Sequence, residues 1–155
     1  PDQSSAASDV YKRQIMAHKT TTHWRGGMLF ESDNPSGNNV LMDTKQTAGP
    51  LQKGLSPKAM MLSSLAGCSG IDIVDILKKM KITEYNLKIV AEGELTGEHP
   101  KYYHTVAVDY FFSGPKLDKK KCRRAVQLSV EKYCGVMEMF RKFANVKTQT
   151  HFNSN

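Results

Sequence analysis

The stretch Ser56–Met80, SPKAMMLSSLAGCSGIDIVDILKKM, decides the fold predicted for this chain. Ser56 suits a helix N-cap, Pro57 suits the first helical position, and lysines gather at the far end. Apolar residues cover most of the circumference of this helix, whereas a surface helix has a single apolar stripe. The pattern therefore predicts a long helix that is buried nearly all round. Its apolar positions are Met60, Met61, Leu62, Leu65, Ile71, Ile73, Val74, Ile76 and Leu77.

A cysteine between two glycines stands in the middle of this helix. Gly67 and Gly70 flank Cys68, and each glycine costs about 1 kcal/mol of helix stability relative to alanine. Glycine lacks the side chain that keeps another backbone at a distance. We therefore expect a second segment of the chain to approach the helix closely on the face that carries Cys68.

Before the helix, the sequence favours strands. Residues 20–32, TTTHWRGGMLFES, are β-prone, and Gly26 and Gly27 within them suggest a bulge or a close backbone approach in one long strand. The segment DNPSGNN at 33–39 is rich in turn residues, and VLMDT at 40–44 favours a returning strand. A β-hairpin is thus expected to precede the helix.

After the helix, two strands and a second helix are expected. Alternation of apolar and polar residues in 87–95 and 102–112 predicts two strands joined as a hairpin. Asp118 suits the N-cap of a helix whose apolar residues recur at helical spacing, and Gly135, directly after Cys134, suits its C-terminal stop. The remaining expected elements are a short helix at 136–143 and a last strand at 146–152.

Length and composition indicate a single domain. The chain has 155 residues, of which 39% are apolar and 24% charged, as is ordinary for a soluble protein. Residues 1–15 are polar and aperiodic, so we expect a non-native or disordered extension ahead of one domain at 16–155. The sequence has no uninterrupted run of about 18 apolar residues, and its N-terminus lacks the apolar core of a secretory signal. A cytoplasmic location is therefore the default expectation.

The formal net charge of +7 belongs to the body of the chain. Its densest basic segment is KLDKKKCRR at 116–124. One interpretation is the solvated start of an amphipathic helix, and the other is a patch for nucleic acid or another acidic partner. No nucleic-acid motif accompanies the segment, which favours the solvated helix.

Neither the cysteines nor the histidines form a metal-binding pattern. Cys68, Cys122 and Cys134 include no CxxC pair, and three thiols do not make an even disulfide framework. Cys122 is expected to be a partly buried surface thiol. The histidines are single and lack ligand spacing, so we expect no metal. They are His18, His23, His99, His104 and His151.

The segments around Cys68 and Cys134 are similar to those of a known family. LSPKAMMLSSLAGCSGIDIVDILKKM and RRAVQLSVEKYCGV resemble the two cysteine-bearing helices of the OsmC/Ohr family, the osmotically inducible and organic hydroperoxide resistance proteins. HWRGGMLF and HPKYYHTVAVDYFFSG resemble the first and the central strand of that family. The resemblance covers about residues 20–152.

The resemblance implies an assembly and a chemistry. It implies an intertwined α+β homodimer in which antiparallel sheets pack around long central helices, with each active site at the subunit interface. It also implies a thiol peroxidase of the oxidative stress response, an oxidoreductase that needs neither a metal nor another cofactor. Cys68 would be the peroxidatic thiol that attacks an organic hydroperoxide. Cys134 would be the resolving thiol, and an external dithiol would reduce the disulfide between them.

Activation of Cys68 needs a cation that the helix does not supply. A helix dipole helps an anion only within the first turn, and Cys68 lies about a dozen residues beyond the helix start. Cys134, at the expected C-terminus of its helix, should keep an ordinary pKa. The best-characterised branch of the family pairs its reactive cysteine with an arginine from the first strand and a glutamate early in the long helix. Lys58 and Ala59 show that the glutamate is absent here. Arg25 is the proposed cation, and the alternative is a surface arginine on an alternating strand.

Three classes of function stay open on the sequence. The first is a thiol-dependent hydroperoxide reductase, which the resemblance favours. The second is a noncatalytic family member that binds a small apolar ligand in a pocket at the dimer interface. The third is a basic interaction module, which would show salt-sensitive binding to nucleic acid. We expect neither nucleic acid nor a membrane as a partner.

Overall fold

A computed structural model describes residues 17–44 and 52–153 of the chain. The extension expected at 1–15 and most of the loop before the long helix lie outside the described residues. The chain divides into two compact units, and the boundary between them falls after Ala59, within the first turn of the long helix. Each unit is described by itself.

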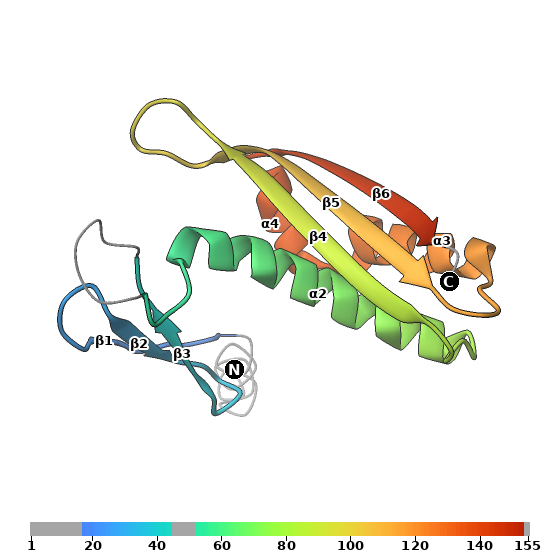
Figure 1. The fold of residues 1–155 in the computed structure, drawn as a ribbon, viewed down its shortest axis with the longest axis horizontal. Coiled ribbons are helices and arrows are strands. Elements are labelled where there is room, and N and C mark those ends of the chain that lie inside the picture. Colours follow the sequence, from blue (N-terminus) through green and yellow to red (C-terminus); the bar gives the residue numbers. More distant parts are fainter. Residues whose placement is uncertain (1–16, 45–51, 154–155) are drawn as a thin grey trace, which may run out of the picture. The chain divides into compact units, whose positions relative to one another are not determined.

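Unit 1 holds a small antiparallel sheet with the strand order β1-β2-β3 (Figure 1). The single long strand expected before the first turn is in fact two strands. Gly26 and Gly27 have φ angles of 100° and 55° and form the turn between these strands, where the Leu29 N–H donates to the Gly26 carbonyl at 3.0 Å. Glycine adopts these positive angles without the steric cost of a side chain, so the pair ends a strand here instead of bulging it. The strands are β1 Thr22–Trp24, β2 Phe30–Asp33 and β3 Asn39–Met42.

The long helix is present as α2, Pro57–Lys79, as predicted. Its burial differs from the prediction. One stripe is buried, whereas Ile71 is 73% exposed and Val74 48% exposed. The expectation of burial all round is therefore wrong for the single chain, because the three-stranded sheet of unit 2 covers only one side of the helix. The buried positions follow each other at one-turn spacing: Leu65, Ser69, Ile73 and Leu77.

By length and composition alone, α2 is apolar enough to cross a membrane, since an 18-residue window of it reaches a mean hydropathy of 1.5. Polar and charged residues interrupt the apolar residues of α2, so the helix contains no uninterrupted apolar run of about 18 residues. A core helix passes the same test, and α2 contributes its buried stripe to the core of unit 2.

Unit 2 is built on a second sheet with the strand order β4-β5-β6. Strands β4 (Asn86–Leu95) and β5 (Tyr103–Ser113) form the expected antiparallel hairpin. Strand β6 (Asn145–Asn153) pairs with β5 in parallel, so this sheet is mixed instead of purely antiparallel. Alternate residues of β5 are buried in the core, as their pattern predicts: Val106, Val108, Tyr110 and Phe112.

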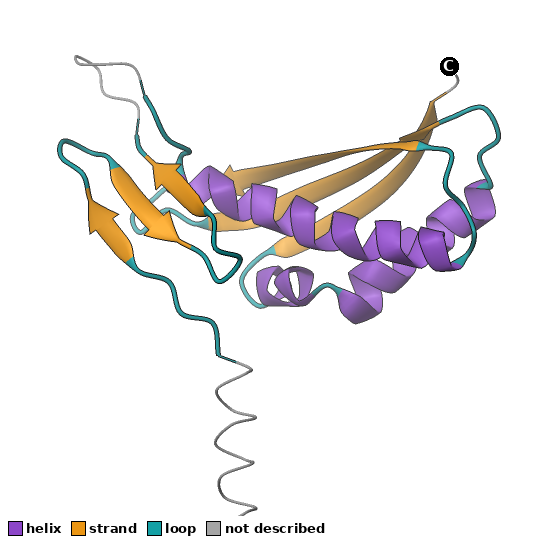
Figure 2. Cartoon of the chain, turned by 90° about the horizontal axis from the view of Figure 1, so that it is seen from below, coloured by secondary structure: helices purple, strands orange, loops and turns teal. Residues whose placement is uncertain are grey.

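Three short helical segments lie on the same side of this sheet as α2 (Figures 1 and 2). The Asp118 carboxylate caps the first of them by accepting from the Lys121 N–H at 3.0 Å, as expected. Gly135 begins α4 instead of stopping the preceding helix, so that part of the prediction is wrong. The segments are α3 Lys119–Leu128, the π-helix η1 Ser129–Tyr133 and α4 Gly135–Arg141.

Helix α3 separates its charged face from its buried face. The basic residues 119–121, 123 and 124 are exposed, as the solvated-helix interpretation predicts. Cys122 is completely buried, so the expectation of a partly buried surface thiol is wrong. It shares the apolar stripe of the helix with Ala125 and Val126. Burial, and then the negative charge of Asp118, raise the pKa of the Cys122 thiol.

Candidate functional site

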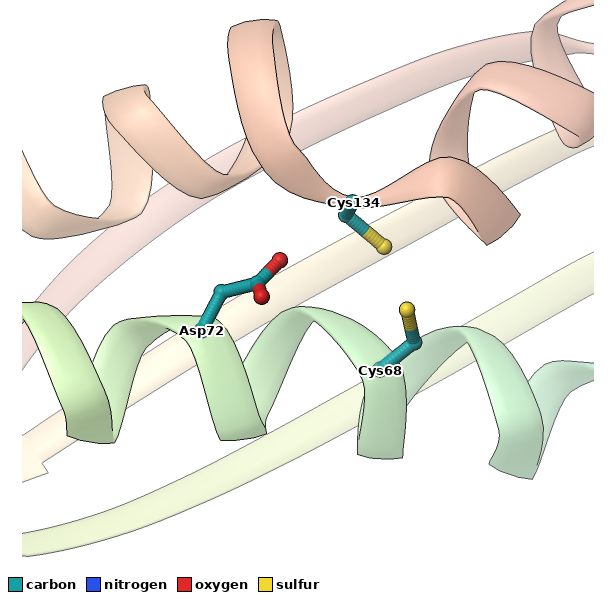
Figure 3. Close-up of side chains that lie close together, drawn as sticks. All are labelled: Cys68, Asp72 and Cys134. Carbon is teal, nitrogen blue, oxygen red and sulfur yellow. The ribbon is translucent and has the colours of Figure 1, made fainter. Parts of the chain in front are cut away.

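Two cysteines and a carboxylate meet in unit 2. Cys68 and Asp72 lie four residues apart on α2, and residues with this spacing share one face of a helix. Cys134 lies between η1 and α4, on the facing segment of the chain. The two sulfur atoms and a carboxylate oxygen of Asp72 lie within 4.8 Å of one another (Figure 3). The structure thus brings together the two thiols that the resemblance pairs, although they are far apart in the sequence.

The junction between η1 and α4 positions Cys134. The Cys134 N–H donates to the Ser129 carbonyl at 2.8 Å and closes the wide turn of the π-helix. The Cys134 sulfur then accepts from the Met137 N–H at 3.3 Å and so caps α4. Such π-helical turns are rare and frequently occur at functional sites. Here the turn directs the thiol toward α2 (Figure 3).

Cys134 is a protonated thiol at neutral pH. Only 4% of the residue is exposed, and this burial is the main cause that raises the pKa of Cys134 to about 11. The Cys68 thiol and the charge of Asp72 raise it further, while the Met137 N–H opposes them. The ordinary pKa expected from a helix C-terminus is therefore wrong, because burial dominates and Cys134 begins a helix as well as ending one.

A buried polar network holds the helix face beside the thiols. The Tyr110 hydroxyl donates to the Ser69 hydroxyl at 3.0 Å, and burial raises the pKa of Tyr110 to about 12. The Ser129 hydroxyl lies 3.1 Å from the Ser69 carbonyl and 3.2 Å from an Asp72 carboxylate oxygen, and it can donate to either. The network fixes α2 against β5 and η1, and so it fixes Asp72 beside the sulfurs.

The two glycines that flank Cys68 have different surroundings. A Cβ on Gly70 would stand 2.9 Å from the Ile89 side chain of β4, so this position needs its glycine for close packing. A Cβ on Gly67 would meet nothing within 4 Å. The expected close approach therefore involves a side chain rather than a backbone, and it occurs at only one of the two glycines.

Arg25, the third residue expected at the site, belongs to unit 1. Its side chain is 51% exposed and pairs with Glu31 of β2, with Nε 2.8 Å from the carboxylate. Asn39 of β3 donates to the other oxygen of Glu31 at 2.9 Å. The Asn39 hydrogen bond and then Arg25 lower the pKa of Glu31, so this carboxylate is an anion at neutral pH. The Arg25 guanidinium thus pairs with the carboxylate of Glu31 on β2, and not with a carboxylate of the long helix.

Cys68, Asp72 and Cys134 also form a possible donor set for a metal ion. Two thiolates and a carboxylate would suit zinc and would leave one position open. None of the five histidines belongs to this group. The expectation that the protein works without a metal stays a prediction.

Asp72 is the residue that the sequence analysis missed. It was embedded in the apolar run IDIVDIL and was treated as part of the long helix. The available signal was its distance of four residues from Cys68, which places a carboxylate on the same helix face as the thiol.

Comparison with known proteins finds related sequences. A sequence model described as OsmC-like protein matches residues 50–149. Protein YhfA of Escherichia coli is 32% identical over 123 residues, which are 79% of this chain and 89% of that protein.

Solved structures share the fold. A hypothetical protein from Aquifex aeolicus is 29% identical, with a TM-score of 0.77 over 90% of this chain and 98% of its own. The organic hydroperoxide resistance protein OhrB of Bacillus subtilis is 20% identical, with a TM-score of 0.59 over 88% of this chain and 98% of its own. The matched sequence model and the likeness to YhfA establish that the chain belongs to the OsmC-like family.

Proposed function

We propose that the protein is a thiol-dependent reductase of organic hydroperoxides. The observation that carries this proposal is the proximity of the Cys68 and Cys134 sulfurs in a chain of the OsmC-like family. Both thiols are free, as a reduced enzyme in the cytoplasm requires. Reduction of a hydroperoxide by this pair needs no further cofactor.

The exposure of the two thiols supports a division of roles. Cys68 is half-buried and within reach of a small substrate, whereas Cys134 is buried and protonated. The Cys68 thiolate would attack the O–O bond, taking one oxygen to become a sulfenic acid and releasing the alcohol. Cys134 would then displace that oxygen as water and form the disulfide, which an external dithiol reduces.

A count of free thiols tests this function. One equivalent of an organic hydroperoxide added to the reduced protein should remove two of its three thiols and leave Cys122 free, because Cys122 is buried away from the pair. Alkylation followed by mass spectrometry gives the count. Three thiols that persist after exposure would contradict the proposal.

A second candidate function is the binding of a small apolar ligand without catalysis. A shallow groove of about 710 Å³ lies between α2 and β4, lined mainly by apolar residues that include Ile71, Val74, Leu87 and Ile89. A protein of this kind would bind apolar compounds and would keep all three thiols in the test above.

We propose a homodimer as the working form. Exposed apolar side chains remain in both units: Trp24, Phe30 and Leu41 in unit 1, and Ile71 and Val74 in unit 2. A sheet of three short strands does not bury a face by itself, and a second copy of the chain would cover these surfaces. Sedimentation at micromolar concentration should show a dimer, and a stable folded monomer would contradict this proposal.

We also propose that Arg25 stabilises the Cys68 thiolate. The ion pair with Glu31 supports this role. The long helix has Lys58 and Ala59 near its start and no glutamate there, and Glu31 supplies a carboxylate to the arginine instead.

A further inference from the structure

Asp72 has the position of a proton acceptor beside the two thiols. Its carboxylate lies within 4.8 Å of both sulfurs, and a hydroxyl group held in the core, that of Ser129, lies 3.2 Å from one of its oxygens (Figure 3). A general base acts over a hydrogen bond or through one water molecule, and such contacts tighten when the reacting groups are in place. Asp72 meets this geometric condition for Cys134.

The resolving step needs such a group. The thiolate is the nucleophile, and the burial of Cys134, which is 4% exposed, disfavours this charged form. Burial and neighbouring negative charge oppose the ionisation of Cys134, whereas the Met137 N–H favours it. Cys134 must nevertheless attack sulfur once Cys68 is oxidised. Removal of its proton during the attack would solve this difficulty.

Building on the proposed reductase function, we propose that Asp72 relays the proton of Cys134 during disulfide formation. The Cys134 sulfur attacks the sulfur of the Cys68 sulfenic acid while its proton passes to the Asp72 carboxylate. The S–O bond breaks, and the leaving oxygen takes the proton from Asp72. The products are the disulfide and one water molecule, and Asp72 returns to its ionised form. The step needs no oxidant or reductant beyond the sulfenic acid itself.

The two steps of the reaction should respond differently to the loss of Asp72. Asp72 takes no proton when Cys68 attacks the peroxide, so its removal should leave the first step at least as fast. Loss of a general base should slow the second step by about a hundredfold. A merely structural role for Asp72 would not produce this split.

The test is a single-turnover reaction of the reduced full chain with one equivalent of cumene hydroperoxide, in the presence of EDTA to exclude metal ions. Trapping with dimedone at successive times measures the sulfenic acid, and mass spectrometry measures the disulfide. In Asp72→Asn, the sulfenic acid should form at least as fast as in the wild type and should then accumulate. The asparagine carbonyl still accepts the Ser129 hydrogen bond, so the fold is retained. Asp72→Glu should restore part of the second rate.

Asp75→Asn is the matched control. Asp75 is on the same helix, but its carboxylate is exposed and pairs with Lys79 at 2.6 Å. This variant should resolve its sulfenic acid at the wild-type rate. Equal disulfide rates in wild type and Asp72→Asn would overturn the relay and leave the reductase function intact. A wild type that forms no sulfenic acid would overturn both.

Discussion

Replacement of Cys68 by serine should abolish hydroperoxide reduction, whereas replacement of Cys134 by serine should stop the reaction after its first half. A serine hydroxyl is not ionised at neutral pH and cannot take the peroxide oxygen as a thiolate does. Cys68→Ser should therefore consume hydroperoxide only at the rate of the solution without protein. Cys134→Ser keeps the attacking thiol and loses only the group that removes the oxygen.

The measurement is made without a reducing agent, so that each molecule reacts once. Cys134→Ser should consume one equivalent of hydroperoxide and hold a sulfenic acid that dimedone labels. The wild type should show only a transient label and then the Cys68–Cys134 disulfide in peptide maps. Cys122→Ser is the control and should behave as the wild type, since Cys122 is buried on α3.

Two results would contradict the assignment of the thiols. One is unchanged consumption of hydroperoxide by Cys68→Ser. The other is a disulfide that contains Cys122, which would require the core of unit 2 to open because this residue is completely buried.

Local patterns were sufficient to predict the main elements of the fold. The serine and proline at the start of α2 and the lysines at its end located this helix. The alternation of apolar residues located β4 and β5. These signals depend on neighbours within a few residues along the chain. The two-glycine turn between β1 and β2 was mistaken for a bulge, because both features use glycine at positive φ and only the pairing of the strands separates them.

The properties of the site depended on packing that the sequence does not display. Gly135 was interpreted as a stop signal, but the chain passes through a π-helix and starts α4 there. The raised pKa of Cys134 is mainly an effect of burial, which follows from the positions of α2 and β5. Asp72 was a charged residue within an apolar run, and its hydrogen bond with Ser129 and its proximity to the two sulfurs distinguish it from Asp75 on the same helix.

Replacement of Arg25 by alanine should slow the attack of Cys68 on hydroperoxide at neutral pH, by up to about tenfold for each unit by which the ionisation moves to higher pH. Loss of a cation that stabilises the Cys68 thiolate moves the ionisation of this thiol to higher pH. A shift of one pH unit corresponds to a loss of about 1.4 kcal/mol in the stabilisation of the thiolate relative to the thiol. The dipole of α2 offers no substitute, because Cys68 lies beyond its first turn. Lys58 lies roughly 15 Å from Cys68 along the helix axis, at 1.5 Å per residue.

The Cys122→Ser/Cys134→Ser background leaves Cys68 as the only thiol, so absorbance of the thiolate against pH reports on this residue alone. Arg25→Ala in that background should move the curve upward by about one unit or more, the effect of a nearby charge on a thiol. Arg25→Lys should move it less. Arg124→Ala is the matched control, since it removes one positive charge from α3, where Arg124 contacts Gln127 at 3.0 Å, and it should leave the curve in place. Superimposable curves for Arg25→Ala and its parent would mean that Arg25 serves only its ion pair with Glu31, and that another group activates Cys68.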